Sequence, residues 1–299
     1  MNRNSNVYTV IYATVLTVLV AVLLSAAALG LKDKQKANSD NEKKQQILSA
    51  VSKQIGKEVT FENAAEIWNE LKMDENLLCV SKDGSVKEGV NVFELAPKAQ
   101  FSKGAVKDDA ELPVYVANVN GTSYYIMCMY GAGLWDAIWG YLAVDSEGNI
   151  AGASFDHAGE TAGLGAKIKD DPAFAESFIG KNIWTNGELT SVGVTKPGKP
   201  STHGGDKIDG ITGATKTCDC VDEMMWQSLL GYKNFLLAGK PMLLNEEAGC
   251  CGEKAEGCCG HCGEKAEGEC CGKCQNEGEG NCEGKAEGEC CGKCEENNK

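Results

Sequence analysis

The amino-acid sequence of 299 residues predicts an α+β fold: one N-terminal transmembrane helix, a domain of mixed strands with flanking helices, and a disordered C-terminal tail. An uncharged apolar run near the N-terminus, paired β-branched and aromatic runs in the middle, and 12 of the 16 cysteines crowded near the end predict this arrangement. We expect a short N-terminal tail at residues 1–6, the transmembrane helix at 7–31, a helical polar region at 32–111, the domain at 112–244 and the tail at 245–299.

Residues 7–31 contain no charged side chain. At 1.5 Å per residue, a helix of this length crosses a hydrocarbon core about 30 Å thick. A cleaved secretory signal is the alternative, because small residues follow at 25–28. We favour an uncleaved anchor, since the apolar run is longer than a signal peptide needs. Five lysines between Lys32 and Lys44 favour a cytoplasmic body by the positive-inside rule.

The net charge of −14 excludes a basic surface for nucleic acid. Residues 245–299 hold 14 Glu and 6 Lys, so the tail supplies −8 of that charge. The body has only four cysteines and is therefore not a disulfide scaffold. These are Cys79, Cys128, Cys218 and Cys220.

Two stretches of the polar region, 45–56 and 62–73, show apolar residues at helical spacing. From residue 112 the pattern changes to two strand-like runs on either side of Asn120 and Gly121, a strong hairpin signal. A second pair is expected at 139–144 and 150–155. Further helices are expected at 172–179 and after Thr217.

Residues 209–217 read Asp-Gly-Ile-Thr-Gly-Ala-Thr-Lys-Thr and precede an amphipathic helix. A glycine-rich turn that enters a helix favours phosphate, because backbone N–H groups are free there. A Walker A loop is excluded, since Thr215 rather than Gly precedes Lys216. The remaining interpretations are a phosphoester on the hydroxyl of Thr215 and a plain loop with Thr217 as helix cap.

The stretch resembles the flavinylation motif of FMN-binding domains in the C subunit of the Na+-translocating NADH:quinone oxidoreductase and the G subunit of the Rnf-type complex. The resemblance implies that a flavin transferase, with FAD as donor, esterifies Thr215 with the phosphate of FMN. It also makes residues 112–244 an FMN-binding domain. The other matching positions are Asp209, Gly210, Thr212, Gly213, Ala214 and Thr217.

Residues 159–165 are similar to the Glu-Thr-Pro-Gly-Leu-Gly loop with which this family encloses the flavin ring. Ala162 replaces the proline, and His157 stands one position away from a histidine of many relatives, so we give it no role. Residues 133–145 resemble a stretch of the C subunit that the Rnf-type subunit lacks; within it, Trp135 is either a core aromatic or a neighbour of the flavin. The implied flavin-binding positions of the loop are Glu160, Thr161, Gly163, Leu164 and Gly165.

The resemblance implies a membrane-bound electron relay within a Na+-pumping complex, with no catalytic side chain beyond the flavin and no metal in the domain. The implied partners are a large membrane subunit with FMN and riboflavin, iron–sulfur membrane subunits, an NADH dehydrogenase subunit with FAD and an iron–sulfur centre, and the transferase. The family places the FMN domain on the outer side of the bacterial cytoplasmic membrane, against the lysine pattern.

Three alternatives stay open. The first is that the chain is the G subunit of an Rnf-type ferredoxin complex. The second is an anchored metal-binding or thiol-buffering protein that acts through its tail. The third is a protein that binds FMN without a covalent bond. The tail repeats a Cys-Cys-Gly-x-Cys unit, whose Cys-x-x-Cys spacing suits soft metals. Its candidate ligands are Cys259, Cys262, Cys271, Cys274, Cys291 and Cys294.

Overall fold

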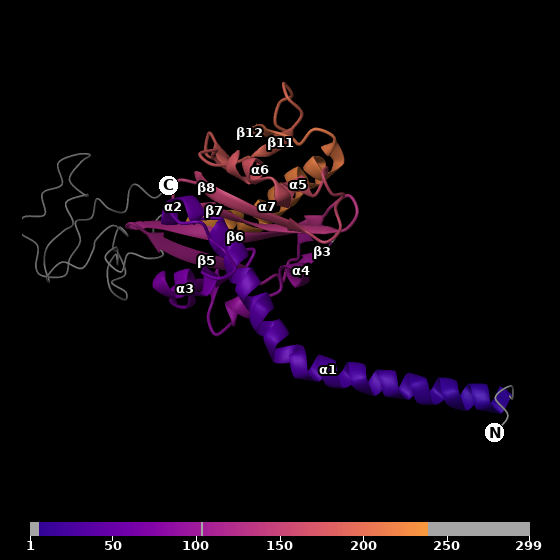
Figure 1. The fold of residues 1–299 in the computed structure, drawn as a ribbon. Coiled ribbons are helices and arrows are strands. Elements are labelled where there is room, and N and C mark those ends of the chain that lie inside the picture. The colour runs from indigo at the N-terminus through magenta and orange to yellow at the C-terminus, as the bar shows by residue number, and fades with distance from the viewer. Residues whose placement is uncertain (1–5, 103, 239–299) are drawn as a thin grey trace, which may run out of the picture. The chain divides into compact units, whose positions relative to one another are not determined.

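The computed structural model describes residues 6–102 and 104–238, and its helices and strands are labelled in Figure 1. The described residues up to Leu236 form one compact unit. The six cysteines proposed as metal ligands belong to the tail, which lies outside the described residues. Within the described part, one long apolar helix and a mixed α+β domain confirm the predicted fold class.

Helix α1 (Asn6–Ser49) contains the predicted span and continues beyond it. Its most apolar window of 18 residues has a mean hydropathy of 2.5 and is not buried in the protein. The C-terminal part of the helix, from Lys36 onward, contacts the domain, and Ile47 and Leu48 there are fully buried. The helix therefore joins an apolar surface, suited to lipid, directly to the domain.

Six strands form one sheet in which all neighbours are antiparallel. The hairpin predicted at Asn120 and Gly121 is present, and both residues have positive φ (53° and 81°), as a tight hairpin turn requires. The second predicted pair is also present. In sheet order, the strands are β2 (Val86–Lys87), β1 (Leu77–Val80), β5 (Leu112–Val119), β6 (Thr122–Ala132), β7 (Ala137–Val144) and β8 (Ile150–His157).

The region 32–111 is less helical than the sequence suggests, because β1 and β2 belong to the main sheet. Helices do cover the two stretches with helical spacing, as the end of α1, α2 and α3. The remaining elements are α2 (Ser52–Ile55), α3 (Ala64–Glu70), η1 (Met73–Glu75), η2 (Val92–Glu94), α4 (Pro97–Gln100), β3 (Phe101–Ser102), β4 (Ala105–Val106), α5 (Lys167–Asp170), α6 (Pro172–Glu176), β9 (Trp184–Thr185), β10 (Glu188–Leu189), β11 (Gly193–Thr195), β12 (Lys207–Asp209) and α7 (Thr215–Ala238).

Helices cover both faces of the sheet. Trp68 of α3 packs against Tyr115 of β5, with ring centroids 6.2 Å apart, and Phe235 of α7 packs against Tyr125 of β6, also at 6.2 Å. Because Tyr115 pairs with Ile126, Tyr125 points to the opposite face. The sheet therefore lies between α3 and α7, as Figure 1 shows. This explains why β5 is buried at seven of its eight positions instead of alternating.

Helix α7 is also fastened to the sheet by a buried polar contact. The Tyr232 hydroxyl donates to the Pro113 carbonyl at 2.9 Å and lies 3.3 Å from the sulfur of Cys128. Burial raises the pKa of the Cys128 thiol to about 11, so the thiol is neutral at physiological pH. The core therefore fixes α7, and with it the first residue of the helix, Thr215.

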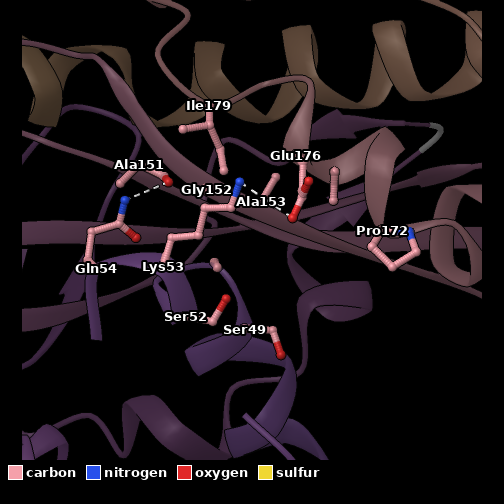
Figure 2. A pocket seen from close by; sticks show the side chains of 12 residues that line it. Ser49, Ser52, Lys53, Gln54, Ala151, Gly152, Ala153, Pro172, Glu176 and Ile179 are labelled. Carbon is pink, nitrogen blue, oxygen red and sulfur yellow. Dashed lines mark hydrogen bonds and ion pairs between the residues drawn. The ribbon is translucent and has the colours of Figure 1, made fainter. Parts of the chain in front are cut away.

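A narrow cavity of about 160 Å³ lies where α2 crosses β8 beside α6 (Figure 2). Across it the ammonium of Lys53 lies 3.4 Å from a carboxylate oxygen of Glu176, and the Gln54 amide donates to the Ala151 carbonyl at 2.8 Å. None of its lining residues belongs to the three motifs. The cavity is a gap between packed helices and strand β8, and it is not lined by the motif residues.

Candidate functional site

Thr215 is the first residue of α7 and is half-buried. In the first hydrogen bond of the helix, the Cys218 N–H donates to the Ala214 carbonyl at 2.9 Å. The N–H groups of residues 215–217 therefore have no acceptor within the helix. The Thr215 hydroxyl stands at the positive end of a 24-residue helix, where a phosphate group is favoured.

Gly213 supplies the sharp turn ahead of the helix. Its φ is +85°, a conformation that L side chains rarely adopt, and an added Cβ would stand 3.0 Å from Cδ2 of Leu164. The motif turn and the 159–165 loop therefore lie against each other. These two motifs, which are far apart in the sequence, thus meet in the structure.

The interpretation of Thr217 as a helix cap is wrong. The helix begins two residues earlier, at Thr215, and Thr217 is 1% exposed. Its hydroxyl donates to Oε2 of Glu160 at 2.7 Å. Thr217 thus ties the helix to the 159–165 loop.

Glu160 connects all three motifs. Oε2 accepts the Thr217 hydroxyl, and Oε1 accepts the backbone N–H of Trp135 at 3.0 Å. Glu160 is 7% exposed, so these bonds form in a setting where water competes poorly. His157, to which the sequence assigned no role, accepts the Glu160 N–H through Nδ1 at 3.2 Å and so orients the loop.

Gly165 leaves room for this network. A Cβ there would lie 2.5 Å from both Oε2 of Glu160 and the Thr217 oxygen. Any side chain at this position would separate the two groups. The glycine is thus needed for the bond between loop and helix.

Two predicted residues present apolar surface beside this network. Trp135 is 71% exposed and Leu164 is 43% exposed. The interpretation of Trp135 as a core aromatic is therefore wrong. Trp139, in contrast, has a structural role: it is half-buried, and its indole N–H donates to Gln46 of α1 at 3.2 Å.

A cavity of about 230 Å³ opens beside Thr215. The motif residues Gly210, Thr212 and Gly213 line one side, and residues 194–197 line the other. Trp135 and the 159–165 loop are not part of this lining; Trp135 borders a separate cavity of about 340 Å³. Thr161, Gly163 and Asp209 are exposed, and Ala214 is buried in the helix start.

The far wall of the cavity comes from a segment that sequence reasoning missed. Strand β11 pairs in parallel with β12, which leads straight into the motif. Asp222 of α7 accepts the Val194 N–H at 2.9 Å, and the sulfur of Cys218 accepts the Ile211 N–H at 3.2 Å. The spacing of Cys218 and Asp222, one helical turn apart, was the available signal.

These residues fit a phosphate-linked flavin. The hydroxyl of Thr215 is at a helix N-terminus, a cavity opens beside it, and Lys196 lines that cavity. The cavity has room for part of a nucleotide, and the exposed Leu164 and Trp135 offer an apolar surface for a ring. In the described residues, no group of three or more His, Cys, Asp or Glu side chains could hold a metal ion.

Comparisons with known proteins find similar sequences and structures. A sequence model of the FMN-binding domain family matches residues 133–229. The crystal structure of the C subunit of Na(+)-translocating NADH-quinone reductase from Parabacteroides distasonis is 42% identical, with a TM-score of 0.61, and the match covers 69% of this chain and 96% of that one.

Two other matches are more distant. The same protein from Vibrio vulnificus is 28% identical over 234 residues, which cover 74% of this chain and 90% of that protein. The crystal structure of Shewanella oneidensis NqrC, 23% identical with a TM-score of 0.52, shares the fold and covers 68% of this chain and 98% of that one.

Proposed function

Because the chain belongs to the family of NqrC, the C subunit of the Na+-translocating NADH-quinone reductase, we propose that it carries FMN as a phosphoester on Thr215 and relays electrons within that complex. It is an FMN-carrying subunit of an oxidoreductase, and other subunits hold the rest of the reaction. The Rnf-type alternative lacks such support, since the relatives described above are all NqrC proteins.

The observation that carries the proposal is the Glu160 network. It brings the exposed Trp135 and the 159–165 loop to the helix whose first residue is Thr215. Bound FMN supplies electron transfer. The chain's residues hold the phosphate at the helix start, present Leu164 and Trp135 to the ring, and keep the attachment point fixed through the buried contacts of α7.

The attachment of FMN to Thr215 is a phosphoryl transfer. The hydroxyl oxygen of Thr215 forms a bond to the phosphorus of the FMN half of FAD, the pyrophosphate bond breaks, and AMP leaves with the proton. A flavin transferase catalyses this step. The exposed Thr212 and Gly213 beside the hydroxyl leave room for that enzyme.

The test is a denaturing gel viewed under ultraviolet light. Full-length protein from cells with the transferase should give a fluorescent band, and its mass should rise by one FMN less one water. The same protein from cells without the transferase should be dark. A dark band with the transferase present would refute covalent FMN; flavin that washes out on denaturation would favour non-covalent binding.

We propose that electrons reach this FMN from NADH through FAD and iron–sulfur centres on other subunits. They then pass to the large membrane subunit with FMN and riboflavin, and on to quinone, while Na+ is exported. The chain's span, residues 7–31, has no charged side chain to line an ion path. The Na+ path therefore belongs to partners.

Helix α1 is long and apolar enough to cross a membrane, and we propose that it anchors the chain there. We place the FMN domain outside the cytoplasmic membrane, as in the family, although the lysines after the span favour the inside. Protease added to intact spheroplasts should remove the domain and leave a cytoplasmic marker protein intact. Full protection of the domain, with digestion only after lysis, would overturn this orientation.

A further inference from the structure

Three side chains on one stripe of α7 each contact the same segment. Cys218, Asp222 and Trp226 are four residues apart and thus lie above one another on the helix. Their partners are Ile211, Val194 and His203 respectively. All three partners lie in residues 193–211, which we name the flap and which contain β11, β12 and the start of the flavin motif.

The middle contact is the most buried. Asp222 is 8% exposed, and its Oδ1 accepts the Val194 N–H at 2.9 Å. Val194 is itself 4% exposed. On the other side of β11, Gly193 N–H and the Thr195 carbonyl bond to the β12 side of the flap. On this side of β11, the Asp222 carboxylate therefore accepts the hydrogen bond that a neighbouring strand would otherwise accept.

The outer contacts flank this bond. His203 stacks on Trp226 with ring centroids 4.1 Å apart and planes 9° apart, and its Nε2 lies 4.0 Å from Oδ2 of Asp222. At the other end, the Cys218 sulfur accepts the Ile211 N–H, and a Cβ on Gly210 would stand 3.2 Å from that sulfur. The flap thus contacts α7 at three positions, each about one turn from the next.

We propose that Asp222 is a positioning residue for the flavin: it holds the flap against α7 and so fixes the cavity beside Thr215. This inference rests on the proposed function. The geometry is direct, because Val194, Thr195, Lys196 and Pro197 form one wall of the cavity and α7 supplies Thr215 on the other. Without the Asp222 bond, the Val194 N–H stays buried without an acceptor, which favours opening of the flap.

The experiment compares Asp222→Ala with Asp222→Asn in the full-length protein, purified from cells with the flavin transferase. The asparagine keeps an oxygen acceptor for Val194 and loses only the charge. Glu223→Ala is the matched control, because Glu223 is the next residue on the helix and is exposed. Three readouts are taken: hydrogen exchange of the flap by mass spectrometry, the share of fluorescent chains, and the midpoint potential of the flavin.

In Asp222→Ala we expect flap peptides to exchange about fivefold to a hundredfold faster, because one buried donor loses its acceptor. Peptides of β5 should keep the wild-type rate. We also expect a lower share of fluorescent chains or a shifted potential, and Asp222→Asn should restore both. Glu223→Ala should match the wild type in every readout.

Unchanged flap exchange in Asp222→Ala overturns the inference. Faster exchange with unaltered attachment and potential also overturns it, since Asp222 would then act on stability alone. A dark wild-type band refutes the proposed function instead, whatever the flap does. If Asp222→Ala exchanges everywhere and is thus unfolded, Cys218→Ala takes its place, with Cys218→Ser as the variant that keeps an acceptor. In Cys218→Ala, the peptide that contains Ile211 must exchange faster than in the wild type. The share of fluorescent chains or the midpoint potential of the flavin must also change. If either effect is absent, the inference fails.

Discussion

A Thr215→Ala variant is expected to carry no covalent flavin and to fold as the wild type does. The substitution removes the only oxygen of that side chain, so no phosphoester can form at this position. Thr215 is half-buried at the first position of α7, where alanine is well tolerated. We expect a change in unfolding free energy within about 0.5 kcal/mol, typical of a surface position.

The measurement is in-gel fluorescence together with circular dichroism, on protein from cells with the transferase. Thr202→Ala is the control, because it removes an exposed threonine hydroxyl outside the three motifs. It should fluoresce like the wild type. Thr215→Ser keeps a hydroxyl and should retain some flavin. A bright band in folded Thr215→Ala would place the flavin on another residue.

A short contiguous motif is enough to propose Thr215 as the attachment point, whereas the contacts around it cannot be read from the sequence. Thr215 lies in a short contiguous motif, and the helix after it follows from apolar residues at 3.6-residue spacing. Its start was expected just after Thr217, three residues later than the observed start at Thr215, because threonine is a common helix cap. The buried bond from Thr217 to Glu160 overrides that preference, and only tertiary contact reveals it.

The strands of the flap could not be predicted from the sequence pattern. Strands β11 and β12 have three residues each, too short for an alternating pattern. The acceptor of the Val194 N–H on the open side of β11 is Asp222, which lies 28 residues away in the chain. The same reason explains β1 and β2 in the region expected to be helical. Short strands gain their structure from neighbours rather than from their own residues.

Replacement of Glu160 by alanine is expected to have the largest effect on stability among the site residues. Glu160 is 7% exposed, and its carboxylate accepts hydrogen bonds from the Trp135 N–H and the Thr217 hydroxyl. Both donors lose their acceptor in Glu160→Ala. We expect a loss of about 3 kcal/mol, since a hydrogen bond to a charged group contributes about 1.5 to 3 kcal/mol. For a domain of this size, this lowers the melting temperature by about 6 to 12 °C.

Glu160→Gln separates shape from charge. Its amide oxygen can accept from one donor, and its NH₂ can donate to the Thr217 hydroxyl, which also accepts hydrogen bonds. We expect the glutamine variant to lose less than about 1.5 kcal/mol, the net value of one neutral hydrogen bond. Glu188→Ala removes an exposed carboxylate from β10 and should have no effect.

Thermal unfolding in detergent, followed by circular dichroism, measures all three variants. Equal losses in Glu160→Gln and Glu160→Ala would show that the negative charge itself is required. No loss in either would show that the network does not hold the three motifs together. The expected order, with alanine far below glutamine and glutamine near the wild type, would identify Glu160 as the tie that brings Trp135 to the helix of Thr215.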